Sequence, residues 1–243
     1  MLKDFRAAVS FLTLVPAGDS GPDAVPAPWF GLVGWLLGAV AALFAWATSG
    51  VAGDGRILLV AVLIVGGWAV LTRLLHWDGL ADTADAVWGA HDAESRLAIM
   101  HDSRSGAFAI AAVVFVALAQ VFAVAQLISW QAYGLILIAP VLGRLIATVA
   151  LATISPARTE GLAASLAGRL TLRGRIITVA FAAPLGLFAF NFPVTCVLGL
   201  LAAWGVPKLL ARSVNGLTGD ILGASILLVE TITLIAAAMA GGW

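Results

Sequence analysis

The sequence HWDGLADTAD, residues 76–85, is a polar stretch between two long hydrophobic segments, and this alternation sets the fold class. On a helix, Asp78, Asp82 and Asp85 have the spacing i, i+4 and i+7, which places them on one face. Carboxylates so close repel one another unless a cation lies among them. Because all three ligands are oxygens, the pattern favours Mg²⁺ or Mn²⁺ over Zn²⁺. The alternative is a solvated acidic surface, but ionisable groups beside membrane-spanning segments are functional by default.

Composition predicts a protein that crosses a membrane several times. The 243 residues are 62% hydrophobic and only 11% charged, whereas a soluble domain is nearer half apolar. In lipid the backbone must satisfy its own hydrogen bonds, which helices do. We therefore predict an all-α, polytopic integral membrane bundle of about seven transmembrane helices, forming one domain over residues 1–243. The formal net charge of zero gives no reason to expect a nucleic-acid partner. Membrane lipid is an expected partner, and association into a homo-oligomer is left open.

Hydrophobic runs place the membrane spans. Residues 3–15 predict a short interfacial helix with Phe5 and Leu12 on its apolar side, a short core helix being the alternative, and 16–28 form a loop. Gly34 and Gly38 permit close helix contact. A turn is predicted at 53–55 and a break at 191–193, which divides 176–206 into two spans of about 15 residues. The other predicted spans are 29–49, 56–75, 107–129, 131–153 and 221–240.

The basic residues orient these spans. With seven spans, eleven of the thirteen lysines and arginines fall on one side, among them Arg169, and only Arg56 and Arg144 do not. A six-span alternative, with 176–206 as one helix, would move Lys208 and Arg212 to the other side. The positive-inside rule therefore favours seven spans and puts the polar loops, including the acidic stretch, on the cytoplasmic side.

Two further polar segments carry groups suited to phosphate. Asp102-Ser103-Arg104 offers a carboxylate, a hydroxyl and a guanidinium, with helix capping by Ser103 or Ser105 as the alternative. The sequence NGLTGD, residues 215–220, is a glycine-rich turn before the last span, and such turns bind phosphate at helix N-termini. The alternative there is an ordinary N-cap by Thr218 or Asp220.

Isolated polar residues inside the spans need partners. Arg144 lies within a hydrophobic span, where arginine is costly and usually faces a polar interior. It would bind a substrate phosphate or an acidic residue such as Glu230, or extend its side chain to the membrane face. His76 precedes the first aspartate and would bind a ligand or a group beside it, whereas His91 and His101 are expected at the surface.

Five stretches, read together, resemble one family. They are FRAAVSFLTLVP (5–16), HWDGLADTAD (76–85), IMHDSRSGAF (99–108), RTEGL (158–162) and GLTGDILGA (216–224). In this order they are similar to the motifs of the cobalamin synthase family, the adenosylcobinamide-GDP ribazoletransferases. The similarity extends over nearly the whole chain. Asn215, Leu217 and Ser105 depart from the family pattern, but none of them is a candidate ligand.

The resemblance implies a Mg²⁺-dependent transferase of late coenzyme B12 assembly in the bacterial cytoplasmic (inner) membrane, with its active-site loops on the cytoplasmic side. It implies the joining of adenosylcobinamide-GDP to α-ribazole, or to its 5′-phosphate, with release of GMP. The implied metal ligands are Asp78, Asp82 and Asp85. The implied catalytic residues are Asp82, Asp85, Asp102 and Arg104, with Asp85 or Asp102 taking the hydroxyl proton. The substrate-binding candidates are His76, Ser103, Arg144, Arg158, Thr218, Gly219 and Asp220.

Three other functions compete with this one. Membrane transferases that act on CDP-alcohols or prenyl diphosphates also use aspartate-rich helices, but they need a second motif that this sequence lacks. A cation transporter would place its carboxylates near the middle of the membrane, and here they cluster towards one face. A non-catalytic scaffold would not explain three aligned carboxylates.

Overall fold

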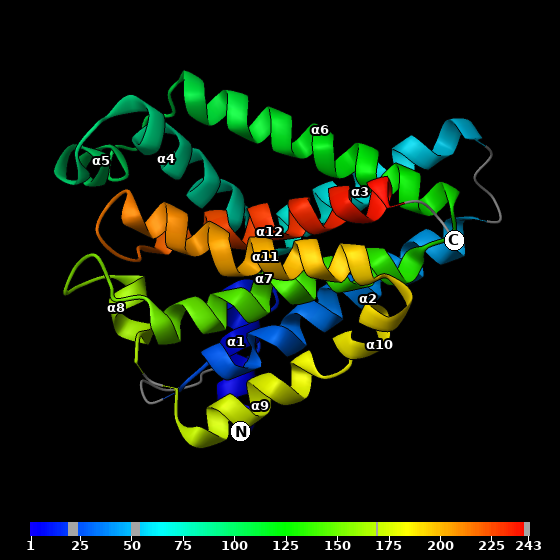
Figure 1. The fold of residues 1–243 in the computed structure, drawn as a ribbon, viewed down its shortest axis with the longest axis horizontal. Coiled ribbons are helices and arrows are strands. Elements are labelled where there is room, and N and C mark those ends of the chain that lie inside the picture. Colours follow the sequence, from blue (N-terminus) through cyan, green and yellow to red (C-terminus); the bar gives the residue numbers. More distant parts are fainter. Residues whose placement is uncertain (19–23, 50–53, 169, 241–243) are drawn as a thin grey trace.

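The computed structural model describes residues 1–18, 24–49, 54–168 and 170–240, so Gly53 and Arg169 lie outside the described residues. The chain forms a bundle of long helices that run along one common direction, with short helices at one end (Figure 1). Within the described ranges there is no strand, and one isolated bridge pairs Pro156 with Leu217. The predicted all-α polytopic bundle is confirmed.

Six segments are long and apolar enough to cross a membrane. They are η1 with α2 (Ala27–Trp29 and Phe30–Ser49), α6 (Ala107–Ser129), α7 (Tyr133–Thr153), α9 with α10 (Leu172–Ala182 and Leu185–Asn191), α11 (Pro193–Arg212) and α12 (Gly219–Met239). The helices α3 (Asp54–Leu71) and α4 (Leu75–Gly89) meet the same criterion only as a bent pair, which brings the total to as many as seven. The remaining helices are α1 (Leu2–Leu12), α5 (Ala93–Ile99) and α8 (Leu162–Leu166).

The predicted span 56–75 corresponds to α3 but ends earlier than predicted, because α3 ends at Leu71 and α4 leaves it at an angle of 88°. Arg73 and Leu74 have φ of 55° and 57°, a left-handed conformation that costs a residue with a side chain roughly 1–2 kcal/mol. The start of the chain holds this bend. The amide of Leu14 donates to the carbonyl of Leu71 at 2.7 Å, and the Arg73 guanidinium donates to the carbonyl of Ser10. The acidic stretch is therefore a packed helix and not a polar loop.

The region 176–206 also differs from its prediction. The predicted break is confirmed, since α10 ends at Asn191 and α11 begins at Pro193, whose ring removes a backbone donor. However, each flanking span has 20 residues, not about 15. Both spans extend into basic segments, and α11 continues through Pro207 to Arg212, where a polar loop was predicted. Long basic side chains allow this, because their stems lie along apolar surface while their charges reach water.

Close backbone packing joins α2 to α7, as the small residues predicted. A Cβ atom added at Gly34 would lie 2.7 Å from the carbonyl oxygen of Pro140, and one at Gly38 would collide with the carbonyl oxygen of Leu137. The centre of the bundle is formed by α7 and α12, the most buried spans, whereas α9 and α10 are the least buried. The bundle therefore has a packed centre and a lipid-facing periphery.

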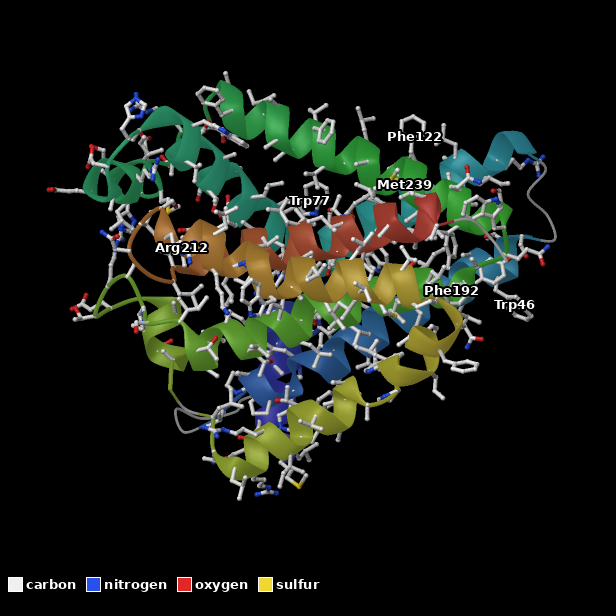
Figure 2. The ribbon with its side chains drawn as sticks, viewed as in Figure 1. Trp46, Trp77, Phe122, Phe192, Arg212 and Met239 are labelled. Carbon is white, nitrogen blue, oxygen red and sulfur yellow. The ribbon has the colours of Figure 1, made fainter. Side chains whose placement is uncertain are left out.

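The polar motifs gather at one end of the bundle. The connection after α4, the short helices α5 and α8, and the loop before α12 gather at one end of the bundle (Figure 1). Figure 2 shows Arg212 towards that end, and Trp46 and Phe192 at the other. This arrangement brings the polar motifs together even though they are far apart in the sequence.

Candidate functional site

Helix α4 carries Asp78, Asp82 and Asp85, so the helical spacing considered for these three residues applies. A Cβ atom at Gly79 would lie 2.6 Å from the carbonyl oxygen of Asp220, so glycine is needed for α4 to approach α12 this closely. As a result Asp220 of α12 lies with the three aspartates of α4. We call Asp78, Asp82, Asp85 and Asp220 the acidic cluster. The Asp82 carboxylate interacts electrostatically with those of Asp78, Asp220 and Asp85. Among the described residues no ion pair neutralises these four carboxylates.

Asp85 also has a structural role that the sequence did not reveal. Its carboxylate accepts hydrogen bonds from the amides of Gly106, at 2.5 Å, and Ala109, at 2.8 Å. These amides open α6, where free N–H groups need acceptors. The alternative, in which Ser103 or Ser105 caps this helix, is wrong, because the N-cap is Gly106 and the acceptor comes from α4. Asp85 thereby fixes the start of α6 against the acidic helix.

Asp102 and Arg104 pair with each other in the exposed loop before α6. Arg104 donates to the Asp102 carboxylate through Nε at 3.0 Å and Nη2 at 2.6 Å. Hydrogen bonds from the Arg104 side chain and amide lower the pKa of Asp102 to about 2. A group with so low a pKa is a poor proton acceptor at neutral pH. The exposed Arg104 remains placed to meet an anion arriving from solvent.

A polar cavity of about 240 Å³ lies beside the acidic cluster. Its wall is fixed by the bridge between Pro156 and Leu217, in which the Ala157 amide donates to the Leu217 carbonyl at 3.0 Å. Thr218 caps α12 by accepting from the amide of Ile221 at 3.1 Å, which confirms one of the two predicted readings of this turn. The cavity is lined by Gly219, the first residue of α12, and by five polar side chains. They are His101, Arg158, Glu160, Thr218 and Asp220.

This cavity brings together predicted and unpredicted residues. Arg158, Thr218, Gly219 and Asp220 were predicted and lie side by side. His101 was assigned to the surface. It is exposed, but it also lines the cavity and interacts electrostatically with Asp220. Its position next to Asp102, inside a predicted motif, was the signal that could have identified it.

Arg144 lies in the middle of the bundle, away from solvent, with 2% of its surface exposed. Its guanidinium forms an ion pair with Glu230 of α12, which confirms the pair suggested by the sequence. The alternative, extension of Arg144 to the membrane face, is wrong because Glu230 neutralises the charge where it lies. His76 is equally buried and interacts electrostatically with Arg144. Binding of substrate by either residue stays a prediction.

The acidic cluster has the right chemistry for a hard divalent cation. No group of three His, Cys, Asp or Glu residues in the described ranges is close enough to hold a metal by itself. Mg²⁺, however, usually takes only one or two protein carboxylates and completes its shell with water and substrate phosphates. Asp78 is exposed and Asp82 half-buried beside it, so the pair offers such a half-site, and the unneutralised charge around it favours a cation.

Comparison with known proteins identifies relatives over the whole length. The model of the family Cobalamin-5-phosphate synthase matches residues 4–238. A protein of Syntrophobacter fumaroxidans named adenosylcobinamide-GDP ribazoletransferase is 40% identical, covering 98% of this chain and 99% of the relative. Proteins with the same name are 34% identical in Novosphingobium aromaticivorans, over 100% of this chain and 98% of the relative, and 38% identical in Pseudomonas aeruginosa, over 98% of each. No solved structure matches. These matches do not favour a transferase of CDP-alcohols or prenyl diphosphates.

Proposed function

The chain belongs to the Cobalamin-5-phosphate synthase family, and from this premise we propose that its polar end transfers the adenosylcobinamide phosphate group to a ribazole acceptor. It is a transferase of cobalamin biosynthesis, with adenosylcobinamide-GDP as donor. The acceptor is α-ribazole or its 5′-phosphate. One observation carries the assignment to this end: four carboxylates, none of them in an ion pair within the described residues, adjoin a cavity that contains Arg158 and the capped N-terminus of α12.

The reaction is a displacement at phosphorus. The acceptor hydroxyl attacks the phosphorus linked to cobinamide, the bond from that phosphorus to the bridging oxygen breaks, and GMP leaves with that oxygen. The hydroxyl proton passes to a carboxylate of the cluster. Arg158 and the N-terminus of α12 are placed to hold the nucleotide phosphates, because guanidinium groups and free helix amides both bind phosphate.

Mg²⁺ would be held by Asp78 and Asp82 together with substrate phosphate, and it would neutralise charge on the leaving phosphate. Asp85 is the third predicted ligand. Its two oxygens already accept amides of α6, so in this proposal it positions the acidic helix. Arg104 stands at the exposed edge of the site, where it would attract the anionic donor.

We further propose that the site faces the cytoplasm of a bacterial inner membrane. Arg158 and Arg212 lie towards the same end of the bundle as the acidic cluster, and basic residues are retained on the cytoplasmic side. Water-soluble nucleotides would reach the site from there. Lipid surrounds the exposed apolar side chains of the outer helices, such as Leu43, Phe115 and Leu201.

The test is GMP release by the purified protein in lipid, given both substrates, with and without Mg²⁺. We expect Mg²⁺-dependent release matched by formation of the cobalamin product. Asp82→Asn should abolish release while the protein remains folded. Glu94→Gln is the matched control, because Glu94 is an exposed carboxylate on α5 that lines neither cavity beside the cluster. Equal release from Asp82→Asn and Glu94→Gln would remove Asp82 from the site.

A further inference from the structure

A second cavity, of about 150 Å³, adjoins the polar one at Asp220. Both cavities are lined by Gly219 and Asp220. The second cavity differs in chemistry: most of its lining is apolar. Its charged residues, Asp78 and Asp220, belong to the acidic cluster, and the buried His76 is its other polar side chain. The two cavities therefore meet at the acidic cluster, one lined by phosphate-binding groups and the other by hydrocarbon.

The apolar part of the lining contains a pair of stacked aromatic rings. Phe11 of α1 and Phe30 of α2 are stacked, with ring centroids 5.7 Å apart and an interplanar angle of 11°. Leu222 and Ile226 of α12 form the facing wall and are almost completely buried. The exposed Asp78 marks the open end. Apolar cavities of about 150 Å³ are known to accept an aromatic ring.

The position of this cavity also explains the N-terminal motif, residues 5–16, which has no part in the proposed catalysis. Residues 5–16 contain no group that binds metal or phosphate in the proposed site. In the structure they hold the bend before α4 and contribute Phe11 to the cavity. The N-terminal helix packs on α2 and supplies one side of the cavity that residues of α4 also line.

Given the proposed function, we propose that this cavity binds the 5,6-dimethylbenzimidazole base of the ribazole acceptor. The base is flat, uncharged and methylated, which suits stacked phenylalanines and buried aliphatic side chains. Its ribose then lies at the open end, beside Asp78 and Asp220, where the attacking hydroxyl is needed. The nucleotide of the donor occupies the polar cavity, so the reacting atoms meet at the carboxylates between the two.

Burial of the two methyl groups of the base in this cavity should raise kcat/KM for the acceptor. Each buried methyl group contributes about fourfold in binding, so the wild-type protein should prefer α-ribazole over the unsubstituted benzimidazole riboside by roughly fifteenfold in kcat/KM. Ile226→Ala enlarges the cavity and should reduce this preference to about fourfold or less. Phe11→Leu removes the stacked wall and should reduce it as well. The KM for adenosylcobinamide-GDP should change less than about twofold in both variants.

Matched controls separate a local effect from a general one. Ile235→Ala makes the same change in the same helix but lines a different cavity, with Val194 and Leu198. Phe44→Leu matches Phe11→Leu and faces a groove between α2 and α3. Both controls should keep the fifteenfold preference. Because Phe11 is only partly buried, its variant tests the cavity even if Ile226→Ala does not fold.

The outcomes distinguish this inference from the function on which it rests. If the wild-type protein transfers to α-ribazole but both cavity variants keep the full preference for the methylated base, the cavity does not hold the base. A rise in the KM for adenosylcobinamide-GDP equal to that for α-ribazole would also overturn the assignment. If the folded wild-type protein releases no GMP with either riboside, it is the proposed function that fails.

Discussion

Two groups of ionised side chains in this bundle differ in how their charge is balanced. In the middle of the bundle, Arg144 and Glu230 neutralise each other and are almost completely buried. At the polar end, Asp78, Asp82 and Asp220 interact with one another without an ion-pair partner in the described residues. A charge that is paired within the protein is already satisfied by the fold, whereas charges left unpaired beside a cavity are available for a ligand.

The largest effect is expected from breaking the balanced pair. Glu230→Leu leaves Arg144 as an uncompensated buried charge, which costs about 3–5 kcal/mol of folding free energy. The double variant Arg144→Leu/Glu230→Leu should recover most of it. Unfolding in detergent followed by circular dichroism measures both. A double variant no more stable than Glu230→Leu would show that the loss does not come from the unpaired Arg144 charge. Turnover by the recovered double variant then tests whether Arg144 also binds substrate.

Removing one unpaired charge of the acidic cluster should lower turnover and leave the stability almost unchanged. Asp220→Asn is expected to lower turnover about 10²–10³-fold, within the range for the loss of a carboxylate that accepts the hydroxyl proton. Its thermal unfolding should stay close to that of the wild type, because repulsion with Asp78 is relieved. Steady-state GMP release and unfolding are measured on the same preparation. Turnover within tenfold of wild type would place the chemistry away from the boundary of the two cavities.

Asp85 lies between these extremes, since its carboxylate is used by the fold. Asp85→Ala removes the acceptor for the first amides of α6 and should cost about 1 kcal/mol of stability. Faster hydrogen exchange at Gly106 and Ala109 would accompany the loss. If stability is unchanged while turnover disappears, Asp85 is a metal ligand, as the sequence predicts, and its contact with α6 is incidental.

The smallest effect is expected at the exposed pair of Asp102 and Arg104. Solvent screens such pairs, so Asp102→Asn should leave the unfolding temperature unchanged. The lowered pKa means that any stabilisation by Asp102 is present above its unfolded pKa and is lost only as the pH falls towards 2. Unfolding of wild type and variant should therefore follow the same pH dependence from about pH 5 to 9. Divergence within that range would show that Asp102 titrates there.

The aspartates of α4 show what the spacing of residues in the sequence can and cannot predict. The spacing of Asp78, Asp82 and Asp85 predicts a shared helix face, and α4 confirms the helix. The spacing could not show that the amides opening α6 use Asp85, because that contact joins residues 21 and 24 positions apart. Nor could it show the left-handed turn at Arg73 and Leu74, since neither residue favours it and contacts with α1 impose it.

The sequence by itself determined the class of fold and the family. It also predicted about seven spans, which agrees with the six spans of the structure plus the bent pair α3 and α4. Hydropathy and ordered motifs are local properties of the chain and can be read without its tertiary structure. Only the tertiary structure decided which charges are balanced and where the motifs meet. Gly79 brings α4 against α12, so Asp220 stands between two cavities of opposite character. Such a juxtaposition depends on helices packing at van der Waals distance, and no periodicity along the chain encodes it.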